Sequence, residues 1–122
     1  MADQTQTSIK KNIGIIQTKI NSAEQAYHIK TGIVNQVTLV AVSKRQSDAR
    51  VEAALAAGQR IYGENRVQEA KTRWAHRRDR HNDIRLHLIG PLQTNKAGDA
   101  VALFDVIEVV DRSKLAKALG DE

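Results

Sequence analysis

The chain has 122 residues, of which 41% are hydrophobic and only 3% aromatic, and its formal net charge is +5. It has no cysteine, which excludes disulfides, thiolate metal sites and a cysteine nucleophile, and no stretch approaches the roughly 20 apolar residues of a membrane span or the apolar core of a signal peptide. We therefore expect a soluble, cytoplasmic protein of one domain, residues 1–122, without a membrane partner.

The first predicted element is an amphipathic helix over residues 7–27, capped at its start by Thr7 or Ser8. Its apolar residues recur at helical spacing: Ile9, Ile13, Ile16, Ile20 and Ala23. Residues 28–36 have the composition of a loop, so that 1–36 form an N-terminal helix and loop ahead of the remaining chain, 37–122.

The stretch Val37–Ser43 predicts a strand with two apolar faces, which is typical of a parallel sheet covered on both sides. A helix follows, with Ser47 as its N-cap and Gly58 at its end. The same alternation then recurs, as strands Arg60–Gly63, Arg85–Ile89 and Val106–Val110 and helices Asn65–Arg77, Thr94–Leu103 and Ser113–Leu119. About four β/α units therefore predict an α/β fold with parallel strands and right-handed crossovers.

Polar or backbone-special residues follow the predicted strands and do not precede them. They are Lys44, then Glu64 and Asn65, then Gly90, Pro91, Gln93, Asn95 and Lys96, and finally Asp111. Because the carboxyl ends of parallel strands lie on one side of a sheet, these groups should meet at one mouth, where barrels and open α/β sheets bind ligands.

Lys44 is the most informative of these residues. Strand alternation puts it on the face of Val40 and Val42, and apolar surroundings would disfavour its ammonium form. Such an amine can attack a carbonyl and form a Schiff base. The alternative, which the pattern leaves open, is a lysine whose stem leaves the core and whose charge reaches water.

Two other candidate features are weaker. His87, inside the third strand, is either a functional group or a hydrogen-bonded core or rim residue, and the histidines have no metal-ligand spacing. Residues 71–85 hold six basic residues against two acidic ones, a local charge of +4 that would attract nucleic acid. No aromatic platform or groove-reading motif accompanies that cluster, so a solvated helix end is the preferred interpretation.

Four motifs together resemble one family. VTLVAVSK, AGQRIYGENRVQEA, LHLIGPLQTNKA and FDVIEVVDRSKLA, in this order, are similar to the pyridoxal-phosphate homeostasis proteins of the YggS/PROSC type, which are related to the N-terminal domain of alanine racemase. The resemblance covers about Val37–Leu119. It implies the N-terminal portion of a TIM-like (β/α)8 barrel of fold-type III, with pyridoxal 5′-phosphate (PLP) held as an aldimine.

The resemblance also implies site residues. Lys44 matches the family's aldimine lysine, and Asn65 and His87 match positions near the cofactor ring or its lysine. Gly63, Glu64, Gly90, Gln93, Asn95 and Lys96 match motif positions around the mouth, without individual roles. No metal site and no catalytic residue is implied.

The sequence departs from the family in its length. A complete barrel needs about 200 residues or more, and the family's phosphate-holding loops lie in the second half. We therefore expect a truncated barrel with impaired PLP binding. Its exposed strand edges predict pairing with a second copy, rearrangement, or dependence on the missing half.

The leading hypothesis from sequence is a non-catalytic PLP-binding protein of vitamin B6 homeostasis that buffers the cofactor or delivers it to PLP-dependent apo-enzymes. One alternative is an amino-acid racemase-like PLP enzyme, for which Tyr27 and Tyr62 are not in evident positions to act as the second acid/base. The other alternative is a basic nucleic-acid-binding module that uses residues 71–85.

Overall fold

The computed structural model describes residues 4–122, which fall into two compact units. The first unit comprises the chain up to Leu39 together with Ser47–Gln59, and the second comprises Val40–Gln46 with Arg60–Glu122. None of the described helices is both long and apolar enough to cross a membrane.

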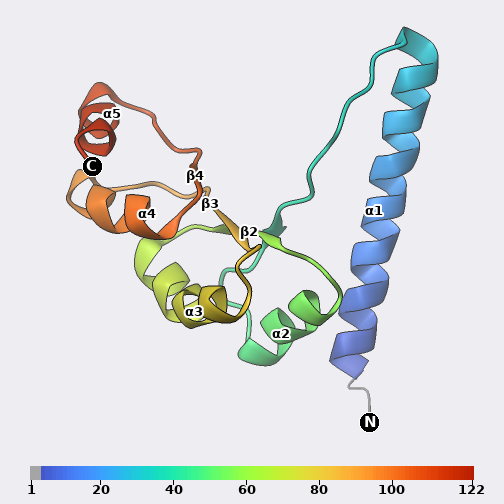
Figure 1. Cartoon of the computed structure of the whole chain (residues 1–122), viewed down its shortest axis with the longest axis horizontal. Coiled ribbons are helices and arrows are strands. Elements are labelled where there is room, and N and C mark those ends of the chain that lie inside the picture. The colour runs from blue at the N-terminus through green and yellow to red at the C-terminus, as the bar shows by residue number, and fades with distance from the viewer. Residues whose placement is uncertain (1–3) are drawn as a thin grey trace. The chain divides into compact units, whose positions relative to one another are not determined.

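The first unit holds two helices that contact each other, α1 (Gln4–Thr31) and α2 (Asp48–Ala56) (Figure 1). Helix α1 is longer than predicted at both ends. Thr7 and Ser8 lie inside it, so the predicted cap is wrong, and it continues into the predicted loop up to Thr31. Gly32 follows with φ +73°, a conformation that favours glycine and ends the helix.

The start of α2 is the one that the sequence predicts. The Ser47 side-chain oxygen accepts a hydrogen bond of 3.3 Å from the backbone N–H of Arg50, which satisfies a donor that the first helical turn leaves free. The helix ends at Ala56, and Gly58 follows with φ +97°. Both punctuation residues are therefore confirmed.

The second unit is built on a parallel sheet of four strands in the order β1-β2-β3-β4. The strands are β1 (Ala41–Val42), β2 (Ile61–Glu64), β3 (Arg85–Leu88) and β4 (Val106–Ile107). This confirms the predicted α/β class. It also leaves β1 and β4 as the edges of the sheet, as expected for part of a barrel.

Strands β1 and β4 are shorter than predicted, and the register explains why. Ala41 pairs with Tyr62, so Val37 would face Gly58, where the chain is still leaving α2. Leu88 pairs with Ile107, so Val110 would face Pro91, beyond the end of β3. A strand can extend only as far as its neighbour offers backbone groups to pair with.

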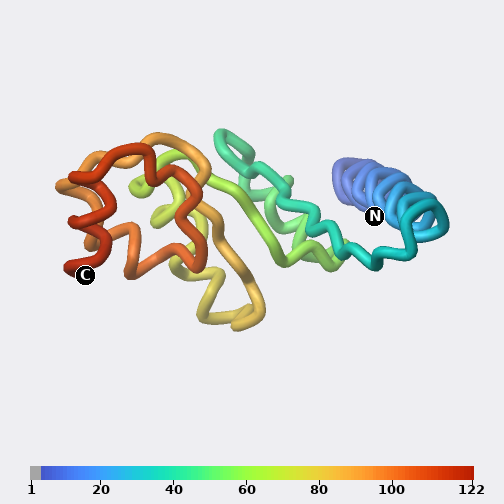
Figure 2. The backbone as a smooth tube through the Cα atoms, turned by 90° about the horizontal axis from the view of Figure 1, so that it is seen from above, coloured from blue at the N-terminus to red at the C-terminus, as the bar shows by residue number. Residues whose placement is uncertain are grey.

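Four helical elements complete this unit: α3 (Val67–Arg80), the short 3-10 helix η1 (Thr94–Lys96), α4 (Ala97–Leu103) and α5 (Ser113–Gly120). Helix α3 contacts β2 and α4, and α4 contacts α5. Both views of the backbone place α4 and α5 side by side (Figures 1 and 2). Helix α3 begins later than predicted because Arg66 is still extended, with φ −132° and ψ 134°.

The two faces of the sheet have different environments. Tyr62, Leu86 and Leu88 share one face and are almost fully buried, and the Tyr62 ring lies 4.3 Å from the ring of Trp74 in α3. The opposite face carries Val42 and Val106, which are 48% and 40% exposed. The core of the unit therefore lies between the sheet and its helices, and the other face is open. In a closed barrel this open face would be the interior.

Candidate functional site

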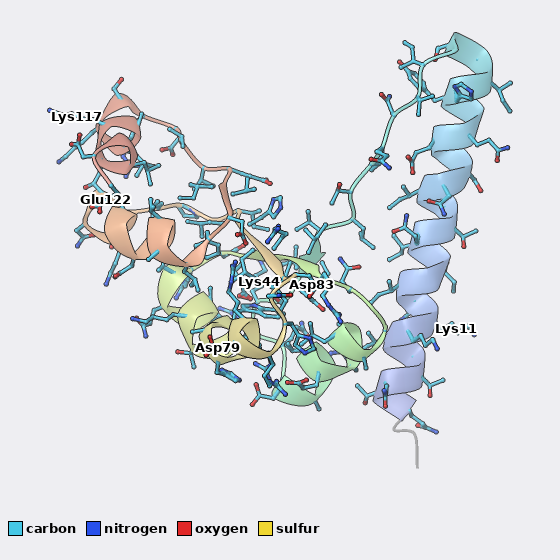
Figure 3. The ribbon with its side chains drawn as sticks, in the orientation of Figure 1. Lys11, Lys44, Asp79, Asp83, Lys117 and Glu122 are labelled. Carbon is cyan, nitrogen blue, oxygen red and sulfur yellow. The ribbon has the colours of Figure 1, made fainter. Side chains whose placement is uncertain are left out.

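Lys44 lies in the turn that directly follows β1, and its side chain is exposed. Since Val42 pairs with Gly63, the same register sets Lys44 level with Asn65, two residues further along each chain. Figure 3 shows Lys44 near the middle of the unit. The shielding expected for this amine is not observed, because the strand alternation assigns Lys44 to the open face of the sheet.

The orientation of this strand end is fixed by the residue before Lys44. Ser43 is buried, and its hydroxyl donates a 2.9 Å hydrogen bond to Oε1 of Glu64, which is fully buried at the end of β2. Both side chains point to the helix-covered face. Lys44 and Asn65 come next, in a turn and a bend just beyond the ends of β1 and β2, and continued strand alternation would place them toward the other face.

The turn itself is held by α3. The backbone N–H of Arg45, which has φ +60°, donates a 2.6 Å hydrogen bond to Glu69, and the carbonyl of Gln46 accepts one of 3.3 Å from Arg73. The left-handed conformation of a non-glycine residue costs free energy, and contacts such as these offset that cost. The hydrogen bond from Arg45 is the largest cause that lowers the pKa of Glu69 below its usual value.

Arg73 connects these groups. Its Nη1 lies 2.7 and 2.8 Å from the two carboxylate oxygens of Glu64, and its Nη2 lies 3.0 Å from Glu69. Burial raises the pKa of Glu64 above its usual value, and the hydrogen bond from Ser43 and the charge of Arg73 oppose that rise without cancelling it. This network gives Glu64 a positioning role on the covered face.

Asn65 is held by an unusually close backbone approach. A Cβ atom added to Gly90 would lie 2.3 Å from the carbonyl oxygen of Asn65 and 2.6 Å from its Cα, so only glycine fits there. The N–H of Ile89 donates to the carbonyl of Glu64 at 2.9 Å, which continues the β2–β3 pairing up to this point. The loops after the two strands are thus locked together.

His87 lies on the open face, paired in register with Gly63 on one side and Val106 on the other. Its Nδ1 is 2.7 Å from Oε1 of Glu108, which follows β4. A carboxylate at this nitrogen fixes the ring and leaves Nε2 for another partner. The sequence did not single out Glu108, because its only signal was a place two residues beyond Val106 on the same face.

A cleft of about 670 Å³ lies between the loops that follow β2, β3 and β4. Its lining residues are Asn65, Arg66, Val67, Gln68, Pro91, Leu92, Gln93, Lys96 and Arg112. Of the three predicted cofactor-binding residues, Asn65 lines it and Lys44 and His87 do not, while Gln93 and Lys96 of the predicted mouth also line it. The predicted gathering of polar groups at the strand ends is therefore observed, but as two neighbouring regions, the open sheet face and this cleft.

At least three of the six basic residues in 71–85 are engaged within the unit. Besides Arg73, Arg77 is buried, and Arg78 pairs with Asp105 at 2.9 Å. Burial by itself would raise the pKa of Asp105, but hydrogen bonds from Arg78 and from the N–H of Leu86 outweigh burial and hold that pKa below its usual value. These contacts count against a nucleic-acid surface. Among residues 4–122, no histidine and carboxylate cluster suits a metal ion.

The fold and the site together define a parallel α/β protein with its polar groups at the carboxyl ends of sequentially ordered strands. That order differs from doubly wound sheets, where the order reverses, and matches one side of a (β/α) barrel. The chain is homologous to pyridoxal phosphate homeostasis proteins, as comparisons with known proteins show.

The relative from Vibrio alginolyticus is 37% identical over 119 residues, which are 95% of this chain and 49% of that protein. The one from Haemophilus influenzae is 34% identical, over 94% of this chain and 47% of its own length. The chain thus spans about half the length of the curated relatives it matches, which agrees with a resemblance confined to the N-terminal half. No family model matches.

Solved structures agree with this relation. PipY of Synechococcus elongatus, determined with PLP bound, is 43% identical, with a TM-score of 0.66 over 81% of this chain and 46% of its own. An unknown protein from Bifidobacterium adolescentis is 28% identical, with a TM-score of 0.83 over 99% of this chain and 51% of its own.

Proposed function

We propose that this chain binds PLP at Lys44 and serves in vitamin B6 homeostasis as a cofactor carrier rather than an enzyme. The observation that carries the proposal is the position of Lys44 at the end of β1, level with Asn65 and assigned to the open face that holds His87. The relatives' names and the PLP bound by PipY support it. Delivery to apo-enzymes in the cytoplasm is part of the same proposal.

The donor set suits the aldehyde end of this cofactor. When bound, PLP supplies an aldehyde that condenses with a primary amine with loss of water. Lys44 in its neutral form provides the attacking nitrogen. The Ser43–Glu64 hydrogen bond and the Glu69 contact to Arg45 hold the turn that carries this nitrogen. Asn65, level with Lys44, offers an amide, and His87, which is paired with Gly63 two residues before Asn65, offers an imidazole.

A racemase-like enzyme is the less favoured function. Racemisation needs a second acid/base group on the opposite side of the substrate. In the unit that carries Lys44, the sole tyrosine is Tyr62, which is 1% exposed on the covered face and packs against Trp74. That phenol is unsuited to proton transfer at the open face, so we expect no turnover of alanine enantiomers in a chiral product assay.

The first prediction concerns Lys44. We expect borohydride reduction, after mixing the protein with an equal concentration of PLP, to attach the cofactor mainly at Lys44, as located by peptide mass spectrometry. Lys44→Ala should remove this adduct, and it should also remove the visible absorbance that the mixture shows before reduction. Lys71→Ala, which deletes an exposed lysine of α3, is the matched control and should label like the parent protein. Equal labelling in Lys44→Ala would contradict the proposed site.

The second prediction concerns association through the open sheet face. Val106 is 40% exposed on this face, at the edge strand β4, and burying it against a second copy is favourable. We expect light scattering after size exclusion to give a dimer mass that Val106→Glu reduces to a monomer. Val101→Glu, at a residue of α4 that is 42% exposed, should leave the dimer intact. A folded monomer of the parent chain at high concentration would refute this pairing.

A further inference from the structure

The charged residues that line the cleft between the loops after β2, β3 and β4 are all basic. Three of its lining residues are basic, namely Arg66, Lys96 and Arg112, and none is acidic. The remaining polar residues of the lining are Asn65, Gln68 and Gln93, each of which carries an amide. An open depression with cations and amide donors, and without a carboxylate, has the composition of an anion-binding site.

The three cations differ in how they are held. Arg112 is fixed from both sides, because Nη1 lies 2.7 Å from Asp111 and Nη2 donates to the carbonyl of Leu92 at 2.7 Å. Arg66 and Lys96 are exposed and make no ion pair with another residue of the described chain. Counting Asp111 against the three cations leaves a local charge of +2 with two side chains available to a ligand.

These side chains come from three separate loops of one unit. Arg66 follows β2, Lys96 lies in η1 after β3, and Arg112 follows β4. The rigid pairing between Gly90 and Asn65 fixes the first two loops against each other. Arg66 is also the N-cap of α3 and makes no side-chain cap hydrogen bond, and Val67 and Gln68 of the first turn of that helix line the same cleft.

From this arrangement we propose that the cleft binds a compact phosphate-bearing anion, with Arg66 and Lys96 as its direct ligands and Arg112 as a fixed positive charge. Such an anion has several acceptor oxygens and up to two negative charges, which matches two exposed cations and neighbouring amides. The site is separate from Lys44, which does not line the cleft. The ligand is either inorganic phosphate or a phosphate monoester such as the one that PLP carries.

The test is a calorimetric titration of the full chain with inorganic phosphate, with PLP and with pyridoxal, which lacks the phosphate. We expect saturable phosphate binding at concentrations up to about 10 mM, weakened about tenfold by Arg66→Gln or Lys96→Gln, since one charged hydrogen bond is worth about one factor of ten. Lys71→Gln, outside the cleft, should bind like the parent chain. Circular dichroism checks that the variants are folded.

Titrations in a Lys44→Ala background distinguish inorganic phosphate from a phosphate monoester as the ligand. They also distinguish this proposal from PLP binding at Lys44. In a Lys44→Ala background, phosphate binding should persist unchanged, because it does not depend on the lysine. If the cleft takes a phosphate monoester, PLP should bind to that background about tenfold more tightly than inorganic phosphate, and pyridoxal should not bind. Absence of saturable binding by the parent chain, or an equal loss in Lys71→Gln, would overturn the proposal.

Discussion

Gly90→Ala is expected to destabilise the second unit by at least about 2 to 3 kcal/mol, more than an ordinary surface substitution. The added methyl group would sit 2.3 Å from the Asn65 carbonyl oxygen and 2.8 Å from its carbonyl carbon. These are backbone atoms, so no side-chain rotation relieves the overlap, and the loops after β2 and β3 must separate. Urea unfolding followed by the fluorescence of Trp74, the single tryptophan, measures the loss.

The matched control is Gly120→Ala in the same unit. Gly120 is exposed at the end of α5, and an added Cβ there has nothing within 4 Å. Its free energy of unfolding should stay within about 0.5 kcal/mol of that of the parent chain. If Gly90→Ala unfolds at the same urea concentration as this control, the close approach to Asn65 is not a constraint on the fold.

The sequence predicts the α/β class and element order well because both follow from patterns along the chain. The periodicity of α1, the Ser47 cap and the alternation of strands and helices are all local signals. The length of a strand does not follow from local signals alone, because it also depends on the neighbouring strand. Val37 to Leu39 has a strand composition, yet β1 begins at Ala41, because the chain across from Val37 is still ending α2.

The site shows the same division. Strand ends and motif residues indicate Lys44, Asn65 and His87, and the register accounts for their relation. The contacts that orient them are not visible in the sequence. Glu64 at the end of β2 forms an ion pair with Arg73 in α3, and Glu108, which follows β4, contacts the ring of His87 in β3. The sequence also suggests a basic surface where Arg73 and Arg78 are in fact used for internal ion pairs.

Arg73→Met is expected to cost about 3 to 5 kcal/mol at neutral pH, because it leaves Glu64 fully buried and without its cation. Methionine keeps much of the side-chain volume, so the loss reflects charge more than packing. The comparison is Asp83→Asn, which breaks the exposed Arg60–Asp83 pair and should cost less than about 1 kcal/mol. Urea unfolding monitored by Trp74 serves for both variants.

The loss of stability in Arg73→Met is expected to depend on pH. Glu64 has a folded pKa above its unfolded value, so folding favours its protonated form, and the stability it contributes falls as pH rises through the folded pKa. Removing Arg73 leaves burial less opposed and raises that pKa further. Arg73 also helps to lower the pKa of Glu69. Its removal therefore reduces the stability that ionised Glu69 contributes at pH values above its unfolded pKa. Both effects make the deficit of Arg73→Met grow as pH rises from the ordinary pKa of these carboxyls through the raised folded pKa of Glu64.

A second substitution assigns that deficit to the buried carboxylate. Glu64→Gln combined with Arg73→Met removes the charge that Arg73→Met strands, and the amide can still accept the hydrogen bond from Ser43. The double variant should therefore be more stable than Arg73→Met at neutral pH, and its remaining deficit should depend less on pH. A loss in Arg73→Met that neither varies with pH nor diminishes in the double variant would mean that the arginine acts through packing.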